Sequence, residues 1–283
     1  MTFYGKATEE KLTEIVETCR RSGGSSIIAL AGVPGTGKSM MASIAAQRLA
    51  SQPEMVREIQ FHPSYSYEEF IEGMRIDNKG GVDVKPGIFM EWNQRALDDS
   101  EHWYVLLIEE LTRANVSAVL GELMTYIENR DRGFTTIYKR RQVKVAGKLI
   151  VLATYNPTDR SAIEVDAALL RRLRVIPCPP STEQLAEMLE GMLDPHVISA
   201  LQNIFDACRA EFPNDYEQLM PFGHGIFAGI KSEYPDLHRL WVERIRYILR
   251  RPLVAPDKFT GVIEKNYPWK DDKFQLTNAG ARA

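Results

Sequence analysis

One octapeptide carries the clearest chemical signal in the chain. It has the spacing of a phosphate-binding loop, with glycine, four residues, glycine, lysine and serine in order: Gly32-Val33-Pro34-Gly35-Thr36-Gly37-Lys38-Ser39. In such loops backbone N–H groups surround phosphate oxygens, the lysine brings a positive charge to the β- and γ-phosphates, and the serine hydroxyl holds Mg²⁺. We therefore expect a nucleoside triphosphate to bind at Val33, Pro34, Gly35, Thr36, Gly37, Lys38 and Ser39.

The segments on either side of this loop have the patterns that a functional loop requires. The apolar run Ile27–Ala31 predicts a buried strand before it, and Met40–Ala50 predicts a helix with one apolar face after it. A strand, a loop and a helix in this order distinguish a phosphate-binding loop from a glycine-rich turn that shares its spacing by chance.

Two acidic residues end a second apolar segment. The run Trp103–Ile108 stops abruptly at Glu109 and Glu110. Central strands of a parallel sheet deliver polar side chains to the carboxyl edge in this way. We expect Glu109 to hold Mg²⁺ together with Ser39, and Glu110 to orient and activate the attacking water.

A third apolar segment, Leu149–Thr154, also ends in polar residues, among them Asn156. If its strand neighbours the other two, Asn156 is placed to polarise the same water or to contact the γ-phosphate. Taken alone, an asparagine before a proline is equally well explained as a turn residue.

Composition limits the class of protein. The chain has 283 residues, with 35 Lys and Arg against 38 Asp and Glu, so its formal charge of −3 does not indicate a nucleic-acid binder. The cysteines Cys19, Cys178 and Cys208 lack metal-ligand spacing and are expected to be buried thiols. We find no signal-peptide pattern and no apolar run of about 20 residues, so we expect a cytoplasmic protein without a membrane segment.

The order of predicted elements favours an α/β fold: a P-loop core with a parallel sheet between helices, followed by a small all-helical lid. We expect an N-terminal helix in 1–24, the core in 25–180, the lid in 181–252 and an irregular tail in 253–283. Thr8 is the predicted cap of the first helix, and Pro179-Pro180 is the predicted domain boundary. Apolar residues at helical spacing predict one helix over 115–127, and Gly80-Gly81 predicts a hairpin.

A second hairpin is predicted within 129–148. This segment carries seven basic residues, which fit either a solvated loop or a surface that faces nucleic acid or a partner protein: Arg130, Arg132, Lys139, Arg140, Arg141, Lys144 and Lys148.

Taken together, the motifs resemble the McrB branch of the AAA+ NTPases. The resemblance covers residues 25–180 and includes the phosphate-binding loop and the segments Gln60–Gly73, Pro86–Phe89, Ile108–Glu110, Arg113–Asn115 and Asn156–Ser161. Further on, Phe222–Phe227 is similar to the lid motif Gly-His-Ser-Tyr-Phe of that family. Glu109 stands where the family usually has aspartate, which leaves open a slow hydrolase or a nucleotide-dependent switch.

The resemblance implies a ring, of six subunits, with each nucleotide held between neighbours. Arg171 and Arg172 match the family's arginine-rich segment, from which a guanidinium reaches across to the adjacent subunit; a plain surface charge pair is the alternative. Asn156, Asp159 and Arg160 would belong to the sensor segment, and His224 of the lid motif would contact the nucleotide.

The resemblance further implies an NTPase that hydrolyses GTP or ATP with Mg²⁺ and drives an McrC-like or other effector, a nuclease in restriction or antiviral defence. About thirty residues precede the loop, so we expect DNA reading and cutting in other polypeptides, with DNA contacted through the partner or the basic hairpin. A MoxR-like chaperone ATPase that remodels a protein substrate is the alternative. The phosphate-binding motifs do not distinguish guanine from adenine as the base of the nucleotide.

Overall fold

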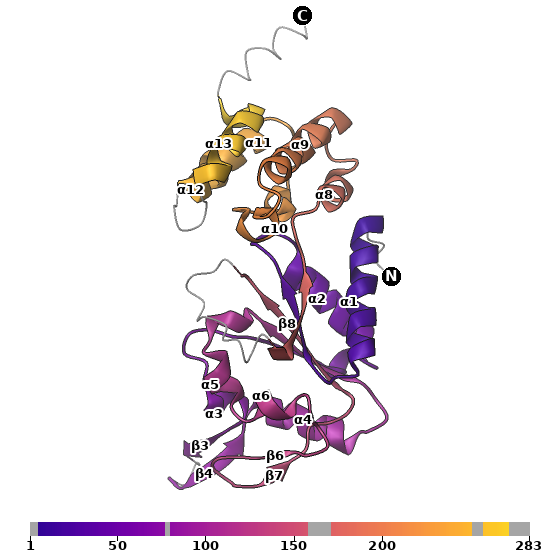
Figure 1. The fold of residues 1–283 in the computed structure, drawn as a ribbon, viewed down its shortest axis with the longest axis vertical. Coiled ribbons are helices and arrows are strands. Elements are labelled where there is room, and N and C mark those ends of the chain that lie inside the picture. The colour runs from indigo at the N-terminus through magenta and orange to yellow at the C-terminus, as the bar shows by residue number, and fades with distance from the viewer. Residues whose placement is uncertain (1–4, 77–79, 158–170, 251–256, 272–283) are drawn as a thin grey trace, which may run out of the picture.

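The computed structural model describes residues 5–76, 80–157, 171–250 and 257–271. These form an elongated molecule with a helical region at one end, an α/β core in the middle and two small hairpins at the other end (Figure 1). The α/β class and the helical region beyond the core are as the sequence predicts.

The core is built on one parallel sheet with the strand order β2-β5-β8-β1-β9. Its strands are β1 (Ile27–Ala31), β2 (Val56–Gln60), β5 (Tyr104–Glu109), β8 (Leu149–Tyr155) and β9 (Leu173–Pro177). Every residue of β1, β5 and β8 is buried, which explains why their sequences are continuous apolar runs. Because these three strands are adjacent and parallel, the segments that follow them meet at one edge of the sheet.

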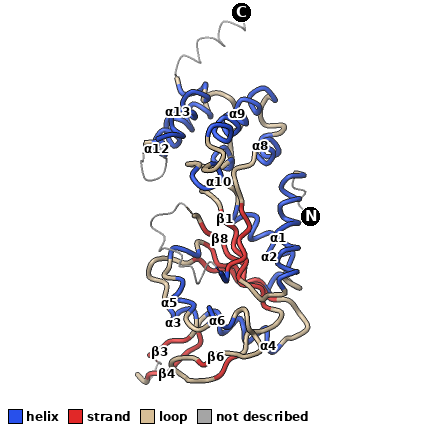
Figure 2. Tube along the Cα trace, viewed as in Figure 1, coloured by secondary structure: helices blue, strands red, loops and turns tan. Residues whose placement is uncertain are grey.

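Helices cover both faces of this sheet (Figure 2). On one face, α1 (Lys6–Ser22) and α2 (Lys38–Leu49) pack on Ile28, Leu30 and the residues of β5 and β8 that share their side. On the other, α4 (Ile88–Asp98), α5 (Val116–Leu120) and α6 (Leu123–Tyr126) pack on the alternate strand residues. Successive strand residues thus feed two separate apolar clusters, as the period of two requires.

Two local predictions about these helices are wrong. The first helix begins at Lys6 with Gly5 at its N-cap, so Thr8 lies inside the helix. The single helix expected over 115–127 is split at Gly121, which has a φ of 50°. A Cβ at this position would lie 2.7 Å from Cε2 of Tyr67, so the helix breaks where the Tyr67 ring takes up the space.

Two antiparallel hairpins extend from the core at the end far from the helical region. The first, β3 (Glu72–Ile76) with β4 (Val82–Pro86), follows the short helix α3 (Tyr67–Phe70). The second, β6 (Phe134–Thr135) with β7 (Gln142–Val143), is the predicted basic hairpin. The buried carboxylate of Glu72 joins them, because its Oε1 accepts from the backbone N–H groups of Tyr138 at 2.9 Å and Lys139 at 3.0 Å.

Not all of the basic residues in this segment face solvent. Arg130 is partly buried and donates to the carbonyl oxygens of Leu149, at 2.9 Å, and Ala146. Burial lowers the pKa of Arg130 to about 10. Lys148 donates to the carbonyl oxygen of Glu101. Five basic residues of the segment are exposed: Arg132, Lys139, Arg140, Arg141 and Lys144.

The helical region contains α8 (Thr182–Leu189), α9 (Pro195–Glu211), α10 (Tyr216–Leu219), α11 (Asp236–Leu240), a π-helical turn (Trp241–Ile245), α12 (Arg246–Leu249) and α13 (Asp257–Asn266). Short 3-10 turns lie at Pro53–Met55, Leu111–Arg113, His224–Phe227 and Pro268–Lys270. Two of these helices have side-chain N-caps: Ser181 Oγ accepts from the Gln184 amide at 3.1 Å, and Asp194 Oδ1 accepts from the His196 amide at 2.8 Å. All three cysteines are buried and free.

The prediction of an irregular tail over 253–283 is wrong for the described residues 257–270, which form α13 and a 3-10 turn. Helix α13 packs on the rest of the helical region through Phe259 and Ile263, and Tyr267 stacks on Trp241 with ring centroids 5.0 Å apart. Phe259 and Ile263 are four residues apart on one face of α13, and Tyr267 follows the end of the helix; all three side chains are buried. Within the described parts of the chain, no helix is both long enough and apolar enough to cross a membrane.

Replacing Ile263 with alanine is expected to lower the free energy of unfolding by about 2–5 kcal/mol, because the fully buried side chain leaves a cavity. Urea denaturation followed by circular dichroism measures this change. Lys265→Ala, on the exposed face of the same helix, should change it by less than about 0.5 kcal/mol. Equal, small effects for both variants would contradict the packing of α13.

Candidate nucleotide site

The phosphate-binding loop connects β1 to α2. Gly35 and Gly37 have φ angles of 80° and 76°, in the left-handed region that glycine adopts without strain. Inside the loop, the carbonyl oxygen of Val33 accepts from Lys38 Nζ at 2.9 Å and from Thr36 Oγ1 at 3.1 Å. Burial lowers the pKa of Lys38, while the nearby carboxylates of Glu109 and Glu110 act to raise it. The lysine that the motif assigns to phosphates therefore lies over the loop and next to the two acidic residues.

Ser39 and Glu109 meet where the loop approaches the end of β5. Ser39 Oγ donates to Glu109 Oε2 at 2.8 Å, and Thr154 Oγ1 of β8 donates to the same oxygen. Glu109 is only 9% exposed, and its other oxygen, Oε1, is buried without a hydrogen-bond partner among the described residues.

The oxygen atoms of Ser39 and Glu109 fit Mg²⁺ as ligands. The ion takes oxygen ligands and keeps several waters, and in P-loop proteins the phosphates of the substrate supply further ligands. A buried carboxylate oxygen without a partner, beside a serine hydroxyl, is the arrangement that such an ion would complete. The described residues hold no group of three or more His, Cys, Asp or Glu side chains that would bind a metal without a substrate.

Glu110 has an unusual backbone. Its φ of 56° is left-handed, which for a non-glycine residue costs of order 1–3 kcal/mol and has to be held by its surroundings. The Glu110 amide donates to Thr154 Oγ1 at 3.2 Å, and its carboxylate lies 3.3 Å from Arg113 Nε. The strained residue and its two partners set the direction of this carboxylate relative to Glu109.

The motifs identify neither Thr154 nor Arg113 as a site residue, although both contact the acidic pair. Thr154 lies near the end of β8, at the edge of the sheet where β5 ends in Glu109. Its hydroxyl joins the Glu109 carboxylate to the Glu110 amide. A polar residue near the end of an otherwise apolar strand was the available signal.

Asn156 follows the end of β8, between the other two strands. The Gly32 amide donates to the carbonyl oxygen of Tyr155 at 3.4 Å, so the start of the phosphate-binding loop is joined to the residue before Asn156. The sheet therefore brings all three predicted strand ends together: the loop, the acidic pair and Asn156.

The helical region also contacts the loop. The Gly223 amide donates to the Pro34 carbonyl and the Gly225 amide to the Gly35 carbonyl, both at 2.7 Å. A Cβ on Gly223 would lie 2.4 Å from the Gly35 carbonyl oxygen, so glycine is required for this approach. These contacts place His224 against the loop.

His224 is buried, and its Nδ1 accepts from the Ser181 amide at 3.1 Å. Because that amide can only donate, the ring proton is assigned to Nε2. Burial lowers the pKa of His224 to about 4, so the ring is neutral at pH 7. Its Nε2 lies 4.0 Å from the point where a Cβ on Gly37 would stand. The helical region therefore offers the loop a neutral N–H donor.

A family model described as an AAA domain of the dynein-related subfamily matches residues 27–173. The chain belongs to the AAA domain family. It is 38% identical over 216 residues to the EcoKMcrB subunit of the type IV methyl-directed restriction enzyme of Escherichia coli K12, covering 71% of this chain and 47% of that protein. The McrB-like branch predicted from the motifs is therefore confirmed.

Other similarities are weaker. YdiS, a component of the type II restriction enzyme BsuMI of Bacillus subtilis 168, is 22% identical over 183 residues, covering 50% of this chain and 53% of that protein. The chain spans about half the length of the curated relatives it matches. A solved structure of NtrX from Brucella abortus covers 71% of this chain and 47% of that chain, with 15% identity and a TM-score of 0.43.

The predicted arginines of this AAA domain lie away from its own phosphate-binding loop. Leu173 at the start of β9 is level with Ile27 at the start of β1, five strand positions or about 16 Å before Gly32 of the loop. Arg171 is exposed, while Arg172 is partly buried with its Nε 3.8 Å from Glu128 Oε2. Asp159 and Arg160, the other predicted sensor residues, lie outside the described residues.

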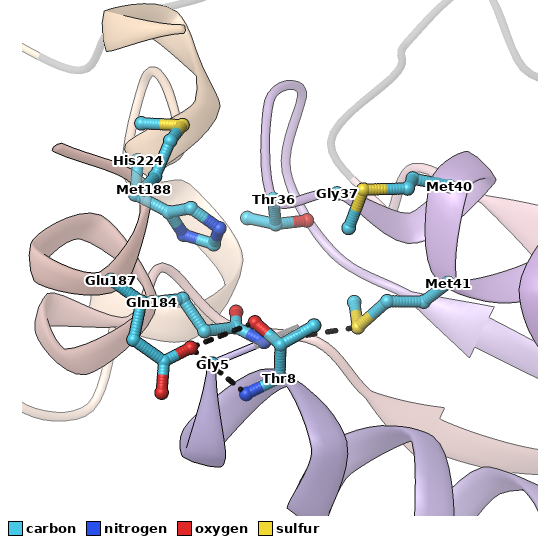
Figure 3. Close-up of a pocket in the computed structure, with 10 residues that line it drawn as sticks. All are labelled: Gly5, Thr8, Thr36, Gly37, Met40, Met41, Gln184, Glu187, Met188 and His224. Carbon is cyan, nitrogen blue, oxygen red and sulfur yellow. Dashed lines mark hydrogen bonds between the residues drawn. The ribbon is translucent and has the colours of Figure 1, made fainter. Parts of the chain in front are cut away.

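A pocket of about 280 Å³ opens beside the loop of the AAA domain (Figure 3). It lies between the loop, the first turns of α1 and α2, and α8, and its lining combines methionine side chains with a few polar groups. The lining residues are Gly5, Thr8, Thr36, Gly37, Met40, Met41, Gln184, Glu187, Met188 and His224. Of these, the motifs identified only Thr36, Gly37 and His224, because the others come from three separate elements without a sequence signature.

Replacing Thr154 with valine is expected to lower kcat for nucleotide hydrolysis about tenfold and to raise the Mg²⁺ concentration needed for half-maximal rate. Valine has nearly the same shape but removes the hydroxyl that joins Glu109 to the Glu110 amide, and such supporting groups are worth about 10- to 100-fold. Phosphate release measured against Mg²⁺ concentration tests this. Thr13→Val, an exposed threonine whose hydroxyl bonds only its own helix, is the control; equal behaviour of the two variants would contradict the role of Thr154.

Proposed function

We propose that this McrB-like AAA+ protein hydrolyses GTP or ATP in an oligomeric ring and drives a partner effector, a nuclease in restriction defence. The observation that carries the proposal is the contact of Ser39 with Glu109 beside the strained Glu110, all at the mouth of the phosphate-binding loop. Both relatives are components of restriction enzymes, which supports this proposal over a MoxR-like chaperone.

In this proposal each residue of the site has a distinct task. Backbone N–H groups of the loop and Lys38 bind the phosphates, and Ser39 and Glu109 would hold Mg²⁺, which when bound neutralises charge on the phosphates. Glu110 accepts a proton from the attacking water, with its carboxylate held by Arg113. Asn156 orients the same water from the neighbouring strand end.

In the proposed ring, the neighbouring subunit supplies an arginine to each nucleotide site. Because Arg171 and Arg172 lie at the opposite end of the sheet strands from their own loop, we propose that one of them reaches the nucleotide of the adjacent subunit. A guanidinium that enters in trans stabilises charge on the γ-phosphate and makes hydrolysis depend on assembly. Asp159 and Arg160 are proposed to complete the sensor segment at the same subunit contact.

The pocket beside the loop is the proposed place of the ribose and base. It is the described cavity that adjoins the loop at Thr36 and Gly37, and His224 offers it a neutral N–H donor. The exposed basic residues of the β6–β7 hairpin are the proposed place of any direct DNA contact, with the effector as the other route to DNA.

Steady-state hydrolysis of GTP and ATP over a range of protein concentrations tests the proposal. A ring with a trans-acting arginine predicts specific activity that rises with concentration and then levels off. Specific activity that is measurable but independent of concentration, down to concentrations at which light scattering reports a monomer, would contradict the ring.

A further inference from the structure

Helix α1 begins without a cap of its own. Its N-cap residue, Gly5, has no side chain to accept from the first-turn amides, which a helix leaves without partners. A carboxylate from α8 takes that place: Glu187 Oε1 accepts from the Ala7 amide, 180 positions away in the sequence, and Oε2 accepts from the Thr8 amide at 3.2 Å and from Thr8 Oγ1 at 3.0 Å. We call these four residues, Gly5, Ala7, Thr8 and Glu187, the α1–α8 latch.

The latch forms one wall of the pocket beside the phosphate-binding loop. Gly5, Thr8 and Glu187 line it on one side, and Thr36 and Gly37 of the loop line it on another. Figure 3 shows Glu187 reaching from α8 to Thr8, with His224 and the loop across the pocket. The contact therefore joins the helical region to the core along one wall of the pocket.

We propose that Glu187 is a positioning residue for the nucleotide, which holds α1 and α8 together around the ribose and base and so slows nucleotide release. This inference rests on the proposed function, because it takes the occupant of the pocket to be a nucleotide. Glu187 acts through α1 rather than on the ligand, since three of the roughly four acceptor positions of a carboxylate are occupied by α1.

The physical reason is linkage between the latch and the ligand. A negative carboxylate at a helix N-terminus is stabilised by the free N–H groups and by the helix dipole. The helical region contacts the loop through Gly223 and Gly225 and the start of α1 through Glu187, so a ligand that touches all three surfaces favours the arrangement in which the latch is closed. This coupling is reciprocal: the factor by which the bound ligand favours the closed latch is the factor by which the closed latch raises the affinity for the ligand. A weakened latch therefore lowers that affinity.

Gly5 offers a second way to open the latch. A Cβ at this position would lie 2.1 Å from Cδ of Glu187, which is too close for both to stay in place. The Gly5 backbone has φ −61° and ψ 166°, an extended conformation open to alanine. Gly5→Ala therefore displaces the carboxylate without removing it.

The experiment measures release of fluorescent, ribose-labelled ADP and GDP from the full chain by stopped-flow displacement. Glu187→Gln and Gly5→Ala are each expected to raise the dissociation rate about three- to tenfold, within the range for loss of a helix cap, and to change the single-turnover hydrolysis rate of bound nucleotide by a smaller factor. The double variant should release no faster than the faster single one, because both changes open the same contact. Glu190→Gln, exposed at the end of the same helix, is the matched control and should match wild type.

The outcomes separate this inference from the function on which it rests. A wild-type chain that binds neither nucleotide would overturn the proposed function. Tight binding with wild-type release rates in both Glu187→Gln and Gly5→Ala would overturn only the latch. Rates in the double variant that multiply would also overturn it, since they would show two independent effects.

Discussion

Replacing Glu110 with glutamine is expected to lower kcat for GTP or ATP hydrolysis by about 10²- to 10⁴-fold, while nucleotide affinity stays within a few-fold of wild type. Glutamine keeps the shape of the side chain but cannot accept a proton from water. The left-handed backbone of Glu110 and its contacts with Thr154 and Arg113 hold the carboxylate in one direction, as expected for a group that acts on a water next to the phosphates.

Phosphate release and equilibrium binding, measured on the same preparations, test this prediction. Glu101→Gln, an exposed change in the turn before β5, is the control and should behave as wild type. A Glu110→Gln variant with kcat within about threefold of wild type would show that another group activates the water, and a variant that no longer binds nucleotide would show that Glu110 holds the site together instead.

The second large effect is expected at the arginines before β9. Because Arg171 is exposed and Arg172 lies near Glu128, Arg171→Ala should cause the greater loss, about 10³-fold or more in kcat, which is the lower end of the range for an arginine supplied in trans. Arg174→Ala, an exposed arginine within β9 itself, is the matched control and should retain activity.

Mixing distinguishes an arginine that acts in trans from one that acts on its own subunit. Arg171→Ala chains keep an intact Glu110, and Glu110→Gln chains keep an intact Arg171. A mixed ring therefore contains contacts where both groups are present, and the mixture should recover part of the wild-type rate. If the mixture is no more active than the two variants alone, then either the arginine acts on the nucleotide of its own subunit or it takes no part in the reaction.

The arrangement of the site was predictable because it depends on short-range patterns. Each of the three apolar runs specifies a buried strand, and parallel strands bring the residues after them to one edge. The loop, Glu109 with Glu110, and Asn156 were placed by this reasoning alone, and β1, β5 and β8 lie side by side as it requires.

The features that were missed depend on contacts between distant segments. The break at Gly121 follows from the ring of Tyr67, and the cap of α1 comes from Glu187 in the helical region. In the sequence Thr154 is part of an apolar strand, whereas in the structure its hydroxyl lies between the Glu109 carboxylate and the Glu110 backbone amide. The apolar residues of α13 have the spacing of a packed helix. However, Trp241, the ring on which Tyr267 stacks just after the helix, lies in a separate element.

A single experiment can show whether Ser39, Glu109 and Glu110 form a magnesium-dependent hydrolytic site on the phosphate-binding loop. It is phosphate release from GTP and from ATP by the wild-type chain, with Mg²⁺ present and with Mg²⁺ removed by a chelator, at a concentration where specific activity has levelled off. We expect turnover of at least one nucleotide that stops without Mg²⁺ and returns when Mg²⁺ is restored. Turnover that continues without Mg²⁺, or tight binding of both nucleotides with no phosphate released, would contradict it.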